Sequence, residues 1–141
     1  MKNLTLIDKA FLLKRTPPFS SLNLDLLLAI ADKLVPLLFE DKDVIFDSGE
    51  EANRMYFIAS GKIKVEDEKS AAEQFLETGN FFGEESLFNN QPRKYTTTAV
   101  DKTQLLALTR TNLYTIISEC PSVAVGFLQV YTSSFSHRPL L

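Results

Sequence analysis

Between Leu37 and Arg110 the sequence breaks into short runs of β-branched and aromatic residues, and this spacing constrains the fold more than any other feature. Turn signals rich in Asp, Asn, Ser and Gly separate the runs, and Asp101-Lys102 is expected to separate the last two. The runs read LLFE, DVIFD, RMYFIAS, KIKVED, EQFLE, YTTTAV and TQLLALT. Several short strands at such close spacing favour a sandwich or a jelly-roll barrel over a parallel sheet.

The run KIKVED gives the clearest indication of how the strands pair. Lys62 and Lys64 alternate with Ile63 and Val65, so one face of this strand is charged and the other is apolar. A half-exposed strand of this kind is typical of antiparallel sheets, because parallel strands are usually apolar on both faces. We therefore predict an antiparallel roll.

Helices are predicted before the strands. Apolar residues recur at helical spacing over residues 4–14, and Pro17-Pro18 ends this helix because proline lacks the backbone donor and clashes with the preceding turn. Asn23 is the predicted N-cap of a second helix that runs through Leu34. Pro36 is expected to close that segment.

Two further helices are predicted after the strands. Thr111 is the expected N-cap of the first, and Pro121 suits the first position of the second, where its missing N–H is not needed. Residues at helical spacing form a stripe along one face of the last helix. The stripe consists of Ala124, Phe127, Leu128, Tyr131 and Phe135.

Length and composition fit a single domain spanning 1–141. The chain is 45% hydrophobic and 23% charged, which is ordinary for a globular protein. The predicted fold class is mainly β with flanking helices, an antiparallel double-stranded β-helix (jelly-roll) with N-terminal and C-terminal helices. Its expected parts are N-terminal helices at 1–35, the β-roll at 36–110 and C-terminal helices at 111–136.

Charge and the rarest residue types exclude several functions. The formal net charge of −3 argues against nucleic-acid binding by this chain alone, because duplex binders are usually basic. One cysteine, Cys120, and one histidine, His137, exclude an intramolecular disulfide and Cys- or His-based metal sites. The sequence has no nucleophile–base pair and no Walker-type loop, so we predict no catalytic residue, no enzyme activity and no cofactor.

The apolar segments predict a cytoplasmic protein. The N-terminal stretch MKNLTLIDKAFLLKR has charges among its apolar residues and no small-residue cleavage site, so it does not resemble a signal peptide. The longest apolar run is interrupted by Asp32-Lys33 and Pro36, which leaves it too short and too charged to cross a bilayer. No membrane partner is predicted.

The stretch FFGEESLFNNQPRKYTTTAV, residues 81–100, combines groups that suit an anionic ligand. Gly83 permits backbone geometry that other residues resist, and the following EESLF can form one helical turn with free N–H groups. Arg93 supplies a guanidinium for a phosphate, and Glu84 supplies an acceptor for a sugar hydroxyl. A phosphate and a sugar hydroxyl held side by side describe a nucleotide.

The same stretch resembles the phosphate-binding cassette of the cyclic-nucleotide-binding domain family, which includes kinase regulatory subunits, gated channels and catabolite-activator-type regulators. The family pattern runs roughly G-x-x-F-G-E-(L/I)-A-L, a short variable turn, then P-R-(A/S/T)-(A/S)-(T/S). Upstream, IFDSGEEANRMYFIASGKIKV is similar to the family's glycine-bearing strand pair. Within the cassette the retained positions are Gly79, Phe82, Gly83, Glu84, Leu87, Pro92, Arg93 and Thr96.

The resemblance implies a role for each cassette residue. Glu84 would bind the ribose 2′-hydroxyl and Arg93 the cyclic phosphate, beside Gly83. The backbone amides of Glu85, Ser86 and Lys94 would complete the phosphate cage. The last helix would supply a hydrophobic lid over the base, with Tyr131 or Phe135 serving there.

Three cassette positions depart from the family pattern. Glu85 replaces an apolar residue and adds a second negative charge near an anion site. Lys94 and Tyr95 replace small residues; Lys94 could offset Glu85 or point into solvent, and Tyr95 could crowd the sugar or the base. The backbone amides stay available at all three positions.

The resemblance implies a sensor that binds a cyclic nucleotide, cAMP in preference to cGMP, and signals through its C-terminal helices to an unidentified effector protein. The preference for cAMP follows from Lys94, because cGMP-selective relatives often carry Thr there. Alternatives are a ligand-free interaction domain in which Glu84 and Arg93 pair with each other, a jelly-roll binder of another small molecule, and an N-terminal fragment of a catabolite-activator-type transcription regulator. The aromatic stripe leaves a homodimer open.

Overall fold

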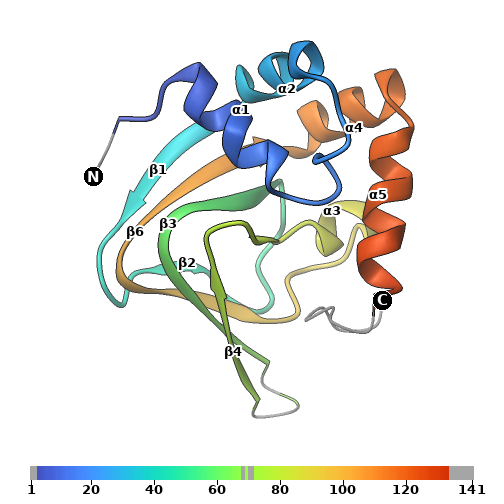
Figure 1. The fold of residues 1–141 in the computed structure, drawn as a ribbon. Helices are drawn as coiled ribbons and strands as arrows, with labels where there is room; N and C mark the ends of the chain where they lie inside the picture. The colour runs from blue at the N-terminus through green and yellow to red at the C-terminus, as the bar shows by residue number, and fades with distance from the viewer. Residues whose placement is uncertain (1–2, 68, 70–71, 134–141) are drawn as a thin grey trace. The chain divides into compact units, whose positions relative to one another are not determined.

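The computed structural model describes residues 3–67, 69 and 72–133 (Figure 1). The chain divides into two compact units, one formed by residues 35–107 and the other by residues up to 34 together with those from 108 onward. The first unit holds the β-roll, and the second holds helices from both ends of the sequence.

The roll is a six-stranded sheet, and every strand pair with an assigned register is antiparallel. Its main strand order is β1-β6-β3-β4; β2 pairs with β6, and β5 pairs with β3. The strands are β1 (Val35–Phe39), β2 (Val44–Phe46), β3 (Arg54–Glu66), β4 (Glu73–Glu77), β5 (Phe81–Phe82) and β6 (Thr96–Thr109). The predicted antiparallel roll with flanking helices is confirmed.

Two sequence predictions about element boundaries were wrong. Asp101 does not divide two strands, because it adopts φ 63° and β6 continues through it to Thr109. Pro36 does not close a helix; it lies inside β1, where it is opposite Leu106. Proline is tolerated there because, among the described strands, β1 pairs only with β6 and is an edge strand.

Alternation along β3 builds the interior of the roll. Ile63 is fully buried and opposite Leu76 of β4, whereas Lys62 and Lys64 are partly exposed, as the sequence predicts. The inward side chains form one apolar cluster that stabilises the roll by removing apolar surface from water. The cluster contains Phe46, Tyr56, Ile58, Ile63, Leu76, Phe82, Tyr95, Leu105 and Ala107.

The left-handed backbone at Gly61, within β3, is held by a neighbouring threonine. Gly61 has φ +90°, and a Cβ there would lie 2.7 Å from the Lys102 carbonyl oxygen. The buried Thr103 hydroxyl donates to the Lys62 carbonyl at 3.1 Å and accepts from the Lys62 N–H at 3.2 Å. Glycine is required here both by the backbone conformation and by the close approach of β6.

The helical unit begins with two well-capped helices, α1 (Leu6–Lys14) and α2 (Leu24–Ala31). Thr5 and Asp8 form a reciprocal capping box at the start of α1. Asn23 caps α2 as predicted, since its side chain accepts from the Leu26 N–H at 3.0 Å. The helix ends at residue 31, earlier than the sequence predicted.

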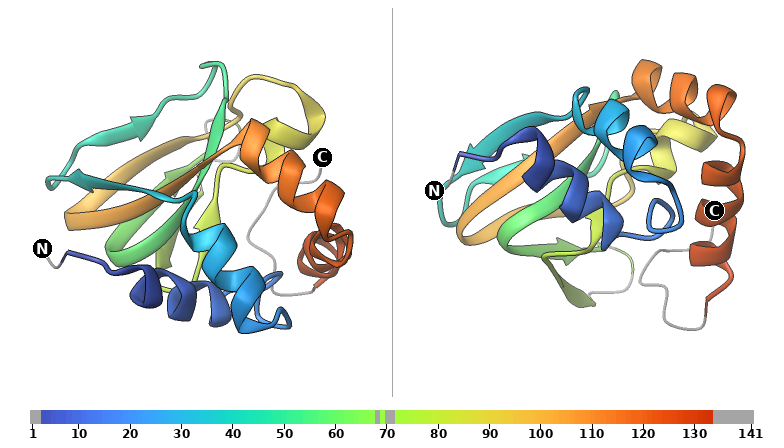
Figure 2. Two further views of the ribbon diagram at one scale, coloured as in Figure 1. Left: turned by 90° about the horizontal axis from the view of Figure 1, so that it is seen from above. Right: turned by 45° about the horizontal axis from the view of Figure 1, so that its top comes forward.

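The C-terminal helices are α4 (Arg110–Glu119) and α5 (Ser122–Tyr131), which turn sharply relative to one another (Figure 2). Thr111 is not the N-cap of α4. Thr109 takes that position because it has extended backbone and its hydroxyl accepts from the Asn112 N–H. Pro121 is the N-cap of α5 and not its first residue as predicted, because the helix begins at Ser122.

The predicted stripe on α5 is only partly buried. Phe127 is buried and meets Phe19 edge to face, but Leu128 is 61% exposed. Gly126 lies so close to Pro18 that a Cβ would be 2.1 Å from the proline Cβ, so the buried face of α5 is centred there. Phe135 lies outside the described residues.

Within the described part of the chain, no single helix is both long enough and apolar enough to span a membrane. Helices α4 and α5 meet the length and composition limits only when taken together, and they are bent by 113° at the break between them.

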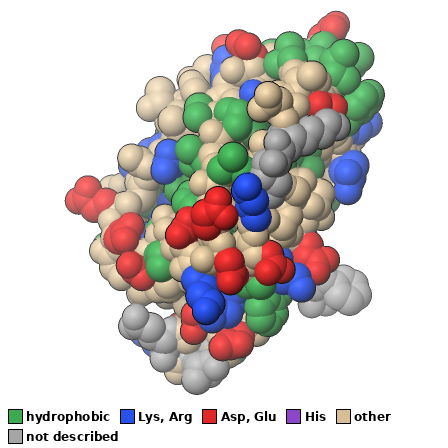
Figure 3. Space-filling view, turned by 90° about the vertical axis from the view of Figure 1, so that its left-hand side faces the viewer, with side chains coloured by type: hydrophobic (Ala, Val, Ile, Leu, Met, Phe, Trp, Pro, Cys, Tyr) green, Lys and Arg blue, Asp and Glu red, His purple; other side chains and the backbone are tan. Residues whose placement is uncertain are grey.

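Acidic and basic side chains are interspersed on the face drawn in Figure 3, so neither sign dominates there.

Candidate ligand-binding site

The cassette connects β5 to β6 through the short helix α3 (Glu85–Asn89), which confirms the single helical turn predicted from EESLF. Asn90 ends this helix in the left-handed conformation, with φ 55°. Gly83 has φ +85°, and a Cβ there would lie 3.0 Å from Nη1 of Arg93. Glycine at this position therefore allows both the turn and the approach of the guanidinium.

The Arg93 side chain is buried, with only 5% of its surface exposed. Nη1 donates to the Gly83 carbonyl oxygen, and Nη2 donates to the Arg54 carbonyl oxygen at 2.7 Å. The guanidinium carbon lies 3.9 Å from the centre of the Phe46 ring. These three contacts fix the plane of the guanidinium.

The Arg93 backbone is held as firmly as its side chain. Its N–H donates to the Glu50 carbonyl, and its carbonyl accepts from the Gly49 N–H, both at 2.8 Å. A third bond, from the Ser48 N–H to the Thr96 hydroxyl at 3.1 Å, continues this pairing. The turn after β2 therefore positions the arginine.

The Arg93 guanidinium is buried without a direct ion pair to any described residue. Burial lowers the pKa of Arg93, and the nearby Tyr95, Tyr56, Glu85 and Glu84 oppose this shift. Among the described residues, no carboxylate forms an ion pair with Arg93, and its buried Nε makes no hydrogen bond. A buried cation without an ion-pair partner costs folding free energy, and an anion within hydrogen-bond distance would offset part of that cost.

Two of the cassette positions that depart from the family pattern contact each other. The Tyr95 hydroxyl lies 2.8 Å and 3.0 Å from the two carboxylate oxygens of Glu85, and both side chains are buried. The same hydroxyl accepts from the Gly83 N–H at 3.1 Å. Burial raises the pKa of Tyr95 well above its ordinary value, with a further contribution from the Glu85 charge, so the phenol keeps its proton and acts as donor.

The structure brings most of the predicted site residues into this one segment. Glu84 is fully buried directly before α3, and Ser86 is buried in its first turn. Lys94 is exposed, which agrees with the second of the two alternatives given for it, that it points into solvent. Tyr131 lies at the end of α5, in the helical unit, and is partly exposed.

Sequence reasoning missed the aromatic surroundings of the cassette. Phe46 lies 5.5 Å from Tyr95 and 6.0 Å from Phe82, measured between ring centres, and Tyr56 stacks on Phe82 at 5.2 Å. Phe46 and Tyr56 are both buried, but DVIFD and RMYFIAS carry consecutive apolar residues without alternation. The pattern therefore does not show which of these side chains face inward, or that the Phe46 ring meets Arg93.

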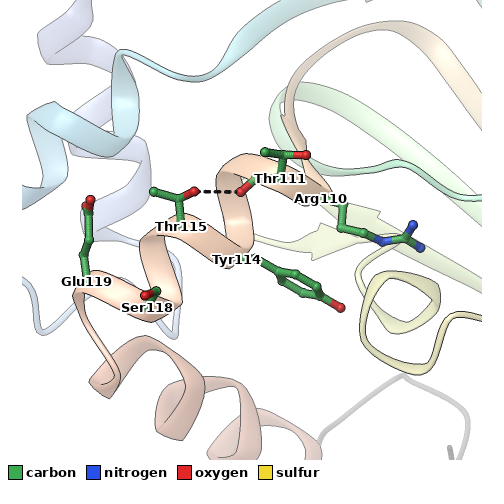
Figure 4. Close-up of a pocket in the computed structure, with 6 residues that line it drawn as sticks. All are labelled: Arg110, Thr111, Tyr114, Thr115, Ser118 and Glu119. Carbon is green, nitrogen blue, oxygen red and sulfur yellow. Dashed lines mark hydrogen bonds between the residues drawn. The ribbon is translucent and has the colours of Figure 1, made fainter.

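A hollow lies along α4 in the helical unit, away from the cassette in sequence (Figure 4). It is open to solvent and has a volume of about 450 Å³. Arg110, Thr111, Tyr114, Thr115, Ser118 and Glu119 line it. The Thr115 hydroxyl donates to the Thr111 carbonyl at 3.0 Å, so this polar group is used within the helix.

The structure thus combines an antiparallel roll with a buried arginine in a glycine-flanked cassette. Residues 36–120 match the family described as the cyclic nucleotide-binding domain. The chain belongs to this family, whose members are regulatory rather than catalytic.

Named relatives and a solved structure agree with this assignment. A protein of Rhodopseudomonas palustris named as a potassium channel is 36% identical over 118 residues, covering 82% of this chain and 29% of the relative. A Rhizobium etli protein named as a cyclic nucleotide-gated potassium channel is 32% identical over 113 residues, covering 80% of this chain and 31% of the relative. The chain thus spans about three tenths of the length of these relatives.

The solved structure is the catabolite activator protein of Thermus thermophilus, which is 27% identical to this chain. The TM-score is 0.73, and the match covers 80% of this chain and 55% of that one. The predicted jelly-roll fold and the family resemblance are both confirmed by these comparisons.

Proposed function

We propose that this chain is a regulatory module that binds a cyclic nucleotide, cAMP in preference to cGMP, and relays the binding event to an effector protein. Arg93 carries the proposal. Its guanidinium is buried, oriented by two backbone carbonyls and an aromatic ring, and retains an Nε donor without a hydrogen bond to the described residues. This arrangement suits one cyclic phosphate.

The other site residues are assigned through the family pattern. Glu84 accepts a hydrogen bond from the ribose 2′-hydroxyl, and the amides of Glu85, Ser86 and Lys94 complete the phosphate cage. Tyr131, at the end of α5, contacts the base. The preference for cAMP rests on Lys94, which stands where cGMP-selective relatives often carry Thr.

Calorimetric titration of the purified protein with cAMP and with cGMP tests this proposal. We expect saturable binding of both, with cAMP the tighter ligand. Glu84→Ala should weaken binding of cAMP and have much less effect on its 2′-deoxy analogue, because that analogue lacks the hydroxyl donor. If neither nucleotide binds at millimolar concentration, the proposed function is wrong.

We propose that α4 and α5 are the elements that respond to the ligand. Hydrogen exchange of their backbone amides should slow when nucleotide saturates the protein, because ligand contacts made in one arrangement shift the population toward it. Unchanged protection at saturation would assign these helices a static role. The two relatives named as potassium channels are 36% and 32% identical to this chain, and the catabolite activator is 27% identical. The effector that these identities support better is therefore a channel, not a transcription regulator.

A ligand-free interaction domain is the second candidate, and Glu85 favours it. Its buried carboxylate adds negative charge beside the proposed phosphate site, which would oppose an anion. The Tyr95 hydroxyl, however, donates to this carboxylate and compensates part of its charge. A thermal-shift measurement with cAMP separates the candidates, since a ligand that binds only the folded state raises the melting temperature.

A further inference from the structure

The hydrogen bonds around Gly83 connect the two departures from the family pattern to the arginine. The Gly83 N–H donates to the Tyr95 hydroxyl, and the Gly83 carbonyl accepts from Nη1 of Arg93. The Tyr95 hydroxyl in turn donates to Glu85. The result is one continuous chain of buried polar groups: Glu85, Tyr95, Gly83 and Arg93.

Gly83 is the point in this chain that most needs to be held. Glycine has no Cβ, so its own sterics do little to fix φ and ψ. Its N–H belongs to the peptide before it and its carbonyl to the peptide after it. Hydrogen bonds at both groups therefore restrain both dihedral angles and, through the carbonyl, the orientation of the Arg93 guanidinium.

We propose that the side chains of Tyr95 and Glu85 are positioning groups of the nucleotide site, acting through Gly83 to orient Arg93 without themselves touching the ligand. This inference rests on the proposed function and extends it to the two residues that otherwise look like defects. The Tyr95 hydroxyl is fully used, because its proton goes to Glu85 and it accepts from Gly83. Glu85 maintains this geometry by accepting the phenol proton at both of its oxygens.

The test compares Tyr95→Phe with a matched control, Thr103→Val. Both variants remove a buried hydroxyl that accepts from a backbone N–H, at 3.1 Å for Tyr95 and 3.2 Å for Thr103. Phenylalanine keeps the ring that packs against Phe46. We expect Tyr95→Phe to weaken cAMP binding about 2- to 10-fold, the effect of one hydrogen bond, and Thr103→Val to leave it unchanged.

The double variant Glu85→Leu/Tyr95→Phe separates positioning from stability. Tyr95→Phe alone leaves a buried carboxylate without its donor, whereas removing both partners costs much less. Stability should therefore recover in the double variant while cAMP affinity stays reduced, because the Gly83 N–H still lacks its acceptor. Recovery of affinity along with stability would overturn the inference, as would wild-type affinity in Tyr95→Phe.

A ligand-free measurement distinguishes failure of this inference from failure of the proposed function. Solvent exchange of the Arg93 Nε proton, followed by nitrogen-15 NMR, should be about 2- to 10-fold faster in Tyr95→Phe than in the wild type. Thr103→Val should match the wild type. If the wild type binds no cyclic nucleotide but this difference is seen, positioning of Arg93 stands and only the ligand is wrong; equal exchange rates would overturn the positioning role.

Discussion

Two glycines of the roll, Gly61 and Gly83, each have φ near +90° and each lie against a polar side chain of the 93–109 segment. At Gly61 the neighbour is Thr103, a neutral hydroxyl whose donor and acceptor are both used by the Lys62 backbone. At Gly83 the neighbour is Arg93, a buried cation with an Nε that makes no hydrogen bond to the described residues.

The difference separates a closed polar cluster from an incomplete one. The Thr103 cluster contains no charge and satisfies itself, so it contributes to stability alone. The Arg93 cluster holds ionisable groups away from water, where each costs folding free energy unless it is paired. Buried ionisable groups of this kind are candidates for ligand binding. We therefore expect variants at the Thr103 cluster to affect stability and variants at the Arg93 cluster to affect binding.

The largest effect on stability is expected at Gly61, beside the Thr103 cluster. In Gly61→Ala the new Cβ would meet the Lys102 oxygen and the Thr103 Cα at 2.7 Å, both backbone atoms that cannot move aside easily. Adding the unfavourable backbone conformation, we expect a loss of about 2–4 kcal/mol in unfolding free energy. Chemical denaturation measures it.

Gly79→Ala is the matched control for Gly61→Ala. Gly79 has φ +95°, but a Cβ added there would meet nothing within 4 Å, so the backbone term of about 1–2 kcal/mol alone applies. Equal losses in the two variants would show that the close approach to β6 has no energetic weight.

The largest effect on ligand binding is expected at Arg93. Arg93→Ala removes a charge-assisted contact of about 1.5–3 kcal/mol, so cAMP affinity should fall roughly 10- to 150-fold. Arg93→Lys should recover only part of the loss, because an ammonium cannot reproduce the planar fork. Calorimetry measures both variants. Lys94→Ala should bind like the wild type, since that side chain is exposed; a comparable loss there would point to general electrostatics instead.

Alkaline pH should lower the unfolding free energy through the titration of Tyr95 in the Arg93 cluster. Because the pKa of Tyr95 is raised in the folded state, its stabilising contribution is complete below the unfolded pKa of about 10 and is lost as pH rises above it. The slope should reach about 1.4 kcal/mol per pH unit at most. Denaturation at a series of pH values should show a shallower slope in Tyr95→Phe, and a slope like the wild type's in Thr103→Val. Identical slopes in all three proteins would contradict this assignment.

The smallest effect on stability is expected at a surface ion pair close to Gly61. Lys62 and Glu77 lie 3.7 Å apart, and their side chains are 43% and 68% exposed. Exposed pairs contribute roughly 0–1 kcal/mol, so Glu77→Gln should change stability within that range and leave cAMP affinity unchanged. Denaturation at low and high salt measures this change. A larger loss would show that charge near the Thr103 cluster also contributes to the stability of the roll.

The sequence predicted the features that depend on local pattern. Alternation at Ile63 and turn signals predicted the antiparallel roll, and the order of glycine, Glu84 and Arg93 predicted the cassette. The boundaries were less accurate because they depend on competition between neighbours. Thr109 and Thr111 are equally good caps by type, and only the path of β6 decides between them.

Side-chain partnership was the part that could not be predicted. Glu85 and Tyr95 are ten positions apart and looked like separate departures from the family pattern, yet they form one hydrogen bond in the structure. Pairing across a turn depends on how α3 and the start of β6 approach each other, which no local propensity specifies. The Phe46 ring beneath Arg93 was missed for the same reason.

The contact between Gly126 and Pro18 has a consequence for the order in which the protein is made. These residues, and the neighbouring rings of Phe19 and Phe127, are about a hundred positions apart in the chain. A ribosome adding 5–20 residues per second therefore completes α5 only about 5–20 s after the N-terminal turn has been synthesised. All six strands of the roll are therefore synthesised before α5, which packs against Pro18 and Phe19 near the N-terminal helices.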